Sequence, residues 1–168
     1  HPVAPIPDIL VLGIDPGIAD TGYGLIKEDR GRLMCLAYGS IKTSAKSDLI
    51  SRLDDLYRQL DVIIKEHKPQ LAAVEQLFFN KNVKTALIVG QARGVALLAL
   101  KRNNLPIIEF TPSQIKQAVA AYGQAAKRQV QQMVKLTLCL DCLPQPDDAA
   151  DALAAAICAS NSRLCPRN

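Results

Sequence analysis

The sequence predicts an α/β protein, and two apolar runs lead to that class. Residues 9–14 form an unbroken run of aliphatic side chains, typical of a buried strand, which ends on Asp15 and a Pro-Gly turn. The run over residues 71–74 ends in the same way, on Glu75. A helix-patterned segment separates the two runs, at the length of a crossover between parallel strands. If the two strands are adjacent, Asp15 and Glu75 meet at the sheet edge where α/β proteins bind ligands.

The other elements follow from apolar spacing and from turn residues. Two apolar segments separated by the polar turn around Arg30 predict an antiparallel pair, and Gly22 and Gly24 in the first of them would let another group come close. Helical periodicity begins at Ser47 and stops before Pro69. The further elements expected are strands over residues 21–27, 33–41 and 106–110, a helix over 83–102, and helices beginning at Pro112, Lys127 and Pro146, the last with Asp147 as its N-cap.

Length and the character of the chain ends predict the domain organisation. With 168 residues, the chain is expected to form one domain, over residues 9–161. The Pro-rich residues 1–8 are expected to be a disordered tail or a remnant of expression, and residues 162–168 a flexible tail. No apolar run reaches the length needed to span a bilayer, and the start does not follow the pattern of a secretory signal. We therefore expect a cytoplasmic protein without a membrane partner.

The net charge is only +4, but the basic residues are concentrated in residues 80–135. That stretch holds nine Lys and Arg against a single acid, Glu109. The nine are Lys81, Lys84, Arg93, Lys101, Arg102, Lys116, Lys127, Arg128 and Lys135. Such a stretch predicts a polyanionic partner, because Lys and Arg make most phosphate contacts. An ordinary solvated basic surface is the alternative.

Five scattered cysteines predict free thiols in a reducing compartment. Cys139 and Cys142 have the spacing of half a zinc knuckle. However, the six residues between Cys158 and Cys165 do not suit a second half, and the segment before them is expected to be helical. We therefore do not expect a structural zinc site.

Four acids stand at the ends of expected elements and form a candidate metal site: Asp15, Glu75, Asp148 and Asp151. Asp148 and Asp151 are three residues apart, so they share one helix face. Clustered carboxylates repel one another in a partly buried site, and hard cations such as Mg²⁺ or Mn²⁺ relieve that repulsion. Two such ions would activate a water and stabilise the leaving oxygen of a phosphodiester. With the basic residues, this pattern predicts a metal-dependent nuclease.

Each of these acids also has a plainer interpretation. Asp15 could cap the Pro-Gly turn that follows it, and Glu75 could be an exposed residue at a strand end. Asp148 and Asp151 could complement the dipole of the last helix. Because Asp147 adjoins Asp148, the set of metal ligands could also be shifted by one residue.

Two apolar features stand beside the candidate site in the sequence. The Phe78-Phe79 pair lies in a polar, basic loop, where it could cover the core or act as a wedge between DNA bases. The helix expected over residues 83–102 is apolar on nearly every side, which suggests a subunit interface in addition to a core face. Gly90 and Gly94 in that helix would permit close approach of a second backbone.

Five motifs, in order, resemble those of the RuvC family of bacterial Holliday-junction resolvases. They are Gly13-Ile14-Asp15-Pro16-Gly17, Thr21-Gly22-Tyr23-Gly24, Glu75-Gln76-Leu77-Phe78-Phe79, Gly90-Gln91-Ala92-Arg93-Gly94-Val95-Ala96 and Asp148-Ala149-Ala150-Asp151-Ala152-Leu153-Ala154. The resemblance covers nearly the whole chain and implies an RNase H-like fold, with a five-stranded mixed sheet flanked by helices. It also implies a homodimer that nicks two opposed strands of a four-way DNA junction during homologous recombination and DNA repair.

The resemblance implies roles for individual residues. The family's four catalytic, metal-binding acids match Asp15, Glu75, Asp148 and Asp151. Lys116 and Lys127 match basic residues near the scissile phosphate, and Phe78 matches an aromatic that stacks at the opened junction. Further candidate DNA contacts are Lys81, Lys84 and Arg128.

The resemblance also implies partners and reveals one departure. It implies a branch-migration helicase complex of RuvA and RuvB as a partner, and a nucleoid-associated location in a bacterium. The family usually has Gly-x-Gly before the turn that leads to Lys127, whereas this chain has Ala121-Tyr122-Gly123. That departure concerns the flexibility of the loop and not the chemistry.

Two other functions share part of the pattern. The strand ending in Asp-Pro-Gly also resembles the first phosphate motif of actin-like ATPases and sugar kinases. Those proteins are much longer and have a second Gly-rich phosphate loop that this sequence lacks. A junction-binding protein without enzymatic activity is the other alternative, but it would have no need for four acids.

Overall fold

A computed structural model describes residues 8–76 and 82–164, which form a mixed sheet and five helices. The strands are β1 (Ile9–Asp15), β2 (Asp20–Asp29), β3 (Arg32–Lys42), β4 (Leu71–Glu75) and β5 (Ile107–Phe110). The helices are α1 (Leu49–His67), α2 (Val83–Arg102), α3 (Pro112–Ala120), α4 (Lys127–Thr137) and α5 (Asp147–Leu164). The sheet has five strands in the order β3-β2-β1-β4-β5, and β4 runs parallel to both β1 and β5. The predicted α/β class and five-stranded mixed sheet are confirmed.

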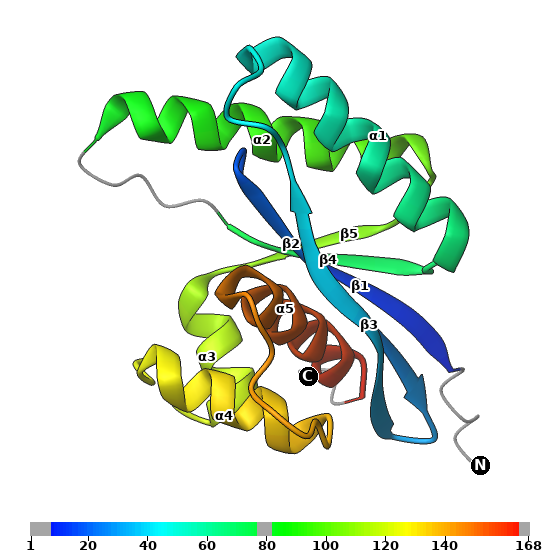
Figure 1. The fold of residues 1–168 in the computed structure, drawn as a ribbon. Helices are drawn as coiled ribbons and strands as arrows, with labels where there is room; N and C mark the ends of the chain where they lie inside the picture. The colour runs from blue at the N-terminus through cyan, green and yellow to red at the C-terminus, as the bar shows by residue number, and fades with distance from the viewer. Residues whose placement is uncertain (1–7, 77–81, 165–168) are drawn as a thin grey trace.

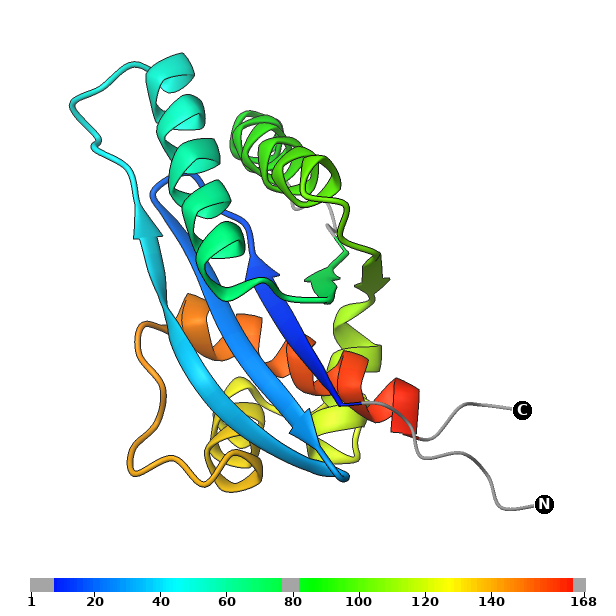
Figure 2. The same ribbon diagram turned by 90° about the vertical axis from the view of Figure 1, so that its right-hand side faces the viewer.

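The sheet separates two helical layers (Figure 1 and Figure 2). α1 and α2 cover one face, whereas α5 covers the other, with α3 and α4 beside it. The apolar core is divided in the same way. Leu12 packs on the side of α1 with Leu56, and its neighbour Val11 packs on the side of α5 with Leu153. This division follows from the alternation of side chains along a strand.

α5 lies in close contact with the sheet because both surfaces consist of small residues. A Cβ added at Gly13 would lie 1.8 Å from the backbone oxygen of Ala152, and one added at Gly22 would lie 1.9 Å from that of Asp148. Buried alanines line the helix over these glycines. The expectation that glycines in β2 admit another group is thus confirmed. This close packing brings the start of α5 to the end of β1.

Two helix starts differ from the sequence-based expectation. α1 begins at Leu49 and not at Ser47, because the carboxylate of Asp48 supplies the N-cap by accepting a hydrogen bond one turn into the helix. α5 begins at Asp147, which is therefore the first helical residue and not the N-cap. The backbone carbonyl of Pro146 accepts the first helical hydrogen bonds, and this leaves the Asp147 side chain to bond α4 instead.

The last helix is longer than expected. α5 continues to Leu164, so residues 162–164 belong to the folded domain and not to a tail. Arg163 donates a hydrogen bond to the carboxylate of Glu28 on β2 at 3.1 Å, and Glu28 is only 2% exposed. This ion pair holds the last turn against the sheet. Residues 1–7 and 165–168, where we expect tails, lie outside the described residues.

By length and composition, α2 could cross a membrane, which corrects the expectation that no segment is long enough. The described structure gives it another setting. Ala92, Ala96 and Leu100 are buried in the core that α2 shares with α1. Arg93 interrupts the apolar sequence and forms an ion pair with Glu109 on β5. A side chain of this kind, charged and paired within the fold, is typical of a helix that packs in a soluble domain.

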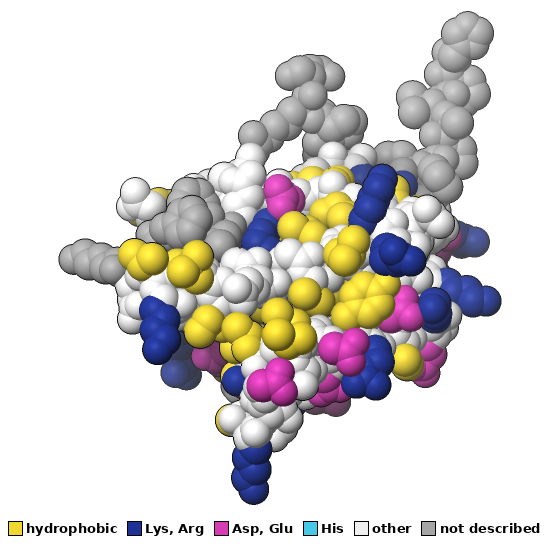
Figure 3. Space-filling view, turned by 90° about the horizontal axis from the view of Figure 1, so that it is seen from above, with side chains coloured by type: hydrophobic (Ala, Val, Ile, Leu, Met, Phe, Trp, Pro, Cys, Tyr) yellow, Lys and Arg dark blue, Asp and Glu magenta, His cyan; other side chains and the backbone are white. Residues whose placement is uncertain are grey.

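Apolar side chains form a band on the face that α1 and α2 cover (Figure 3). On α2, the large apolar residues that are more than half exposed are Val83, Leu87 and Leu98. A Cβ added at Gly90 or Gly94 would meet nothing within 4 Å, so both glycines face open space. The expected second apolar face of this helix is therefore present on the surface.

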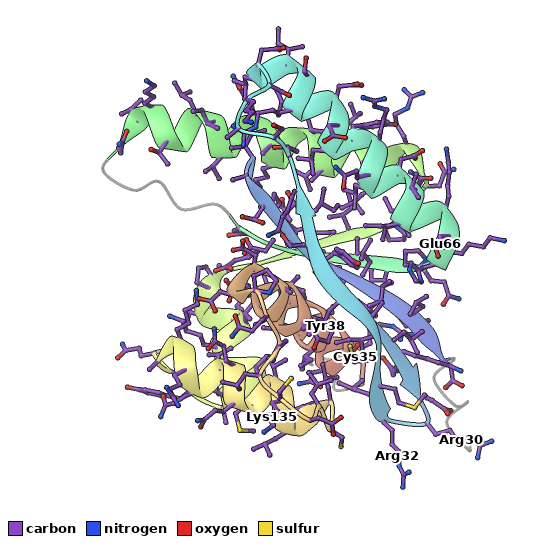
Figure 4. All side chains as sticks on the ribbon, in the orientation of Figure 1. Arg30, Arg32, Cys35, Tyr38, Glu66 and Lys135 are labelled. Carbon is purple, nitrogen blue, oxygen red and sulfur yellow. The ribbon has the colours of Figure 1, made fainter. Side chains whose placement is uncertain are left out.

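β3 is an edge strand that curves over the α5 side of the sheet. Cys35 and Tyr38 pack against the core on that side, whereas Arg30 and Arg32 project from the tip of the β2–β3 hairpin (Figure 4). In the β1–β2 ladder the hairpin lies beside the start of β1. These arginines are therefore at the opposite end of β1 from Asp15.

Candidate active site

The carboxyl ends of two neighbouring strands bring two acids to one edge of the sheet. β1 and β4 are adjacent and parallel, with Ile14 opposite Val74. Asp15 and Glu75 are the next residues along, and each is the last residue of its strand. The adjacency expected of these two strands is confirmed.

The first two turns of α5 bring two further acids over the end of β1. One carboxylate oxygen from each of Asp15, Asp148 and Asp151 lies within 4.8 Å of the other two. Gly22 makes this approach possible, because it pairs with Asp15 in the ladder and lets the backbone of Asp148 contact the strand. Glu75 lies outside this group of three, but its charge still acts on Asp15.

The clustering makes the Asp15 carboxyl hard to ionise. Burial raises its pKa most, and the charges of Asp151, Asp148 and Glu75 add to the effect, so that the pKa rises to about 8. Burial and the charge of Asp151 likewise raise the pKa of Glu75. Buried carboxyls that resist ionisation together are stabilised by a cation. Because every donor is an oxygen, the group fits a hard divalent ion such as Mg²⁺ or Mn²⁺.

Basic side chains partly offset this charge on the far side of Glu75. Lys116, Arg93 and Lys127 all act to lower the pKa of Glu75. Lys116 and Lys127 line a hollow of about 210 Å³. The other residues that line it are Glu75, Pro112, Ile115, Val130, Asp151 and Ala154. Positive charge therefore adjoins the carboxylates, as a site for a phosphate on a metal would require.

Lys127 connects α4 to the acidic cluster. Its ammonium lies 3.3 Å from an oxygen of Asp147 and 3.9 Å from one of Asp151. Partial burial alone would lower the pKa of Lys127, but the charges of Asp151, Asp147 and Asp148 outweigh that effect and raise it. Lys127 therefore remains a cation at neutral pH.

The interpretation of Asp15 as a turn cap is not supported, because Thr21 closes that turn. The Thr21 hydroxyl donates to the Gly17 carbonyl at 2.6 Å and accepts from the Gly17 N–H at 3.1 Å. The Asp15 side chain instead faces Asp148 and Asp151.

Asp147 points away from the cluster and towards α4. Its carboxylate accepts a hydrogen bond from Gln131 at 3.2 Å and is 55% exposed. The cluster of three contains Asp148 and Asp151 but not Asp147. The geometry therefore disfavours a ligand set shifted by one residue.

The remaining predicted residues are distributed as follows. Lys84 is exposed on the first turn of α2, and Arg128 is exposed next to Lys127. Phe78 and Lys81 lie outside the described residues. The four described cysteines are free, and within residues 8–76 and 82–164 the acidic trio is the only group of three potential metal ligands.

Arg93 is a feature of the site to which the sequence-based reasoning assigns no role. Its guanidinium donates a hydrogen bond to the backbone carbonyl of Glu75 and another to the carboxylate of Glu109. With Asp15, Gln76 and Val89, it lines a second hollow, of about 240 Å³, on the α2 side of Glu75. Arg93 is the only charge in the sequence between Lys84 and Lys101, and this isolation is a signal that could have identified it.

Acids at the carboxyl ends of the first and fourth strands, facing acids on the last helix of a mixed five-stranded sheet, define a nuclease with an RNase H-like fold. The family model of the crossover junction endodeoxyribonuclease RuvC matches residues 11–159. The chain belongs to the RuvC family, as the resemblance of its motifs implies. This membership decides against the actin-like and sugar-kinase alternative.

Individual relatives agree with the family assignment. The RuvC of Heliobacterium modesticaldum is 54% identical over 154 residues, which cover 92% of this chain and 95% of that protein. The RuvC of Alkaliphilus metalliredigens is 50% identical and covers similar shares, 92% and 94%. Among solved structures, Thermus thermophilus RuvC in complex with a Holliday junction substrate has a TM-score of 0.87 at 34% identity, covering 93% of this chain and 96% of that one.

Proposed function

We propose that this chain resolves four-way DNA junctions by metal-dependent hydrolysis, nicking two opposed strands symmetrically during recombination and repair. One observation carries the proposal: in a chain of the RuvC family, Asp15, Asp148 and Asp151 converge within 4.8 Å beside a hollow lined by Lys116 and Lys127. Carboxylates of this kind bind cations, and the lysines attract phosphate. The similarity to T. thermophilus RuvC, whose structure contains a junction substrate, supports the choice of DNA.

Asp15, Glu75, Asp148 and Asp151 would hold the metal, which we propose to be two Mg²⁺ ions, with Mn²⁺ as an alternative. When bound, the ions would supply an activated water and stabilise the leaving oxygen. Because the pKa of Asp15 is about 8 in the metal-free protein, ion binding near neutral pH would release a proton from this carboxyl.

The basic residues would position the DNA. Lys116 and Lys127 would hold the scissile phosphate, because both line the hollow that Glu75 and Asp151 share. Lys81, Lys84 and Arg128 would contact the backbone further away. Phe78 would stack on a base at the opened junction centre, an interaction worth roughly 1–3 kcal/mol per base.

A homodimer would supply two active sites for two matched cuts. The exposed residues of α2 suit this pairing. Val83, Leu87, Gly90, Gly94 and Leu98 follow one another at intervals of three or four residues, so they form one stripe along the helix. The glycines would let a second backbone approach closely. We also propose RuvA and RuvB as partners, and a nucleoid-associated location in the bacterial cytoplasm, on the strength of family membership.

The proposed chemistry is tested on a mobile synthetic four-way junction with Mg²⁺, with cuts mapped on all four strands. Asp15→Asn, Glu75→Gln and Asp148→Asn should each abolish cleavage but leave junction binding intact or tighter, because they remove negative charge from a surface that faces phosphate. Asp54→Asn, on the exposed side of α1, is the matched control and should cut normally. Loss of junction binding in all three folded variants would contradict the metal-site role.

The lysines and Phe78 have separate tests. Lys116→Ala and Lys127→Ala should slow cleavage, and any loss of affinity should reduce the salt dependence by about one unit per phosphate contact. Normal cutting by both would leave them as a solvated surface. Phe78→Ala should lose cleavage mainly on fully paired junctions; an equal loss on junctions already open at the centre would indicate a packing role.

The proposed dimer is tested by sedimentation of variants on the α2 stripe. Leu87→Glu and Leu98→Glu should give folded monomers that do not resolve junctions, because both positions are exposed in the single chain. Val95 is less suitable for this test than its sequence suggests, because it packs against the core. Val62→Glu, on the exposed side of α1, is the control. A monomeric variant that still makes paired cuts would rule out the dimer.

A further inference from the structure

We infer that Arg93 is a positioning residue for the catalytic site: its guanidinium fixes the end of β4, and with it the Glu75 carboxylate, by joining β4, β5 and α2. The inference rests on the proposed function, because it assigns Glu75 to the metal. Arg93 itself touches neither the acidic trio nor, by this assignment, the substrate.

The contacts of Arg93 show how it would act. One terminal nitrogen donates to the backbone carbonyl of Glu75, and the other donates to Glu109 at 2.5 Å. Glu109 lies opposite Val74 in the β4–β5 ladder, so the two acceptors belong to neighbouring strands. The Arg93 side chain is only 13% exposed. Holding two acceptors at once requires the planar fork of arginine, which a lysine ammonium does not reproduce.

The end of β4 needs such support because little else holds it. Beyond Glu75 the pairing with β5 continues by one described hydrogen bond, from the N–H of Gln76 to the carbonyl of Phe110. Crowded carboxylates also repel Glu75, whose pKa is raised by burial and by Asp151. The guanidinium behind the strand opposes that repulsion while its hydrogen bond fixes the backbone from which the carboxylate projects. Partners of this kind, one step behind a ligand, typically contribute 10- to 100-fold to metal affinity or activity.

The placement on α2 adds a consequence. Arg93 directly precedes Gly94 of the stripe that we propose as the dimer interface. The same helix would therefore pair the subunits and hold the strand end of the metal site.

The test compares Arg93→Lys, Arg93→Gln and Glu109→Gln by the Mn²⁺ concentration that gives half of the metal-induced rise in melting temperature. Arg93→Lys keeps the charge but loses the fork, and should require 10- to 100-fold more Mn²⁺. Glu109→Gln keeps Arg93 but loosens it, and should move the requirement in the same direction by less. Arg102→Lys, an exposed position on the same helix, should not change it. Junction affinity without metal should be unchanged in all four variants, and cleavage rates should fall in the order of the metal requirement.

Two outcomes would overturn the inference. If Arg93→Lys matches the wild type and only Arg93→Gln is impaired, the charge alone is sufficient. If all three variants melt lower but respond to Mn²⁺ as the wild type does, Arg93 only stabilises the fold. The metal titration does not depend on cleavage. A wild-type protein that binds Mn²⁺ but cuts no junction would contradict the proposed function and leave the role of Arg93 open to the same measurement.

Discussion

The two ends of α5 meet the sheet over buried acids, and they treat those acids in opposite ways. At the C-terminal end, Glu28 is 2% exposed and pairs with Arg163 at 3.1 Å. At the N-terminal end, Asp15 faces Asp148 and Asp151, and its pKa rises to about 8. β1 and β2 run beneath the helix from one end to the other. One end is therefore neutralised within the chain, whereas the other keeps negative charge that only an added cation or proton can balance.

The difference separates a structural acid from a functional one. A buried charge with a fixed partner contributes to a unique fold, and removal of that partner is strongly destabilising. A cluster of like charges reduces stability, and it persists in a protein when the charge serves a ligand. The two ends should therefore respond to charge removal with opposite signs, which the following predictions test in order of decreasing effect.

Arg163→Met should destabilise the protein most, by about 3–5 kcal/mol at pH 7, because it leaves Glu28 buried without this charge partner. Chemical denaturation measures the effect. The double variant Glu28→Gln/Arg163→Met should recover part of the loss, since no ionised carboxylate then remains there. If Arg163→Met alone costs less than 1 kcal/mol, the pair is solvated and the proposed contrast is wrong at this end.

Gly22→Ala should have the next largest effect, because it lifts the helix over the site itself. The added Cβ would lie 1.9 Å from the Asp148 oxygen, a clash with backbone that no rotamer change relieves. We expect a loss of about 2–3 kcal/mol, together with loss of the melting-temperature rise that Mg²⁺ induces. Gly94→Ala is the matched control, since its Cβ meets nothing within 4 Å. Full metal response in Gly22→Ala would show that the close seat of α5 is not needed for the site.

Asp15→Asn should stabilise the metal-free protein, opposite in sign to Arg163→Met. The folded protein retains a proton on Asp15 up to about pH 8, whereas the unfolded chain releases it near the ordinary value of 3.8. The contribution of this group is therefore fully present below about pH 4 and is lost as the pH rises to about 8. At pH 8 the variant should be more stable by about 1–3 kcal/mol, with a flatter pH dependence. Mg²⁺ should stabilise the wild type and not the variant; metal-free stability that does not fall from pH 4 to pH 8 would contradict this account.

Much of the fold, and the acids of the site, could be predicted from the sequence because the signals are local. Apolar runs that end on Asp15 and Glu75 identify strand ends, and parallel pairing brings such ends together. Gly22 also signals close approach, although the sequence does not show what approaches. The pair of Glu28 and Arg163 could not be predicted, because its partners are 135 residues apart and no periodicity links them. Arg93 is similar, since its role depends on a backbone carbonyl, which no residue type reveals.

Asp147→Asn should have the smallest effect, and it sharpens the contrast at the active-site end. Asp147 carries the same charge as Asp148 and adjoins it, but its carboxylate is 55% exposed and bonds Lys127 and Gln131 on α4. An exposed ion pair of this kind contributes about 0–1 kcal/mol. We therefore expect little change in stability and an unchanged Mg²⁺ requirement in a melting-temperature titration, whereas Asp148→Asn should lose the metal response. If Asp147→Asn instead behaves like Asp148→Asn, the ligand set is shifted by one residue. Proximity in sequence would then matter more than the convergence on Asp15 that distinguishes the two acids in the structure.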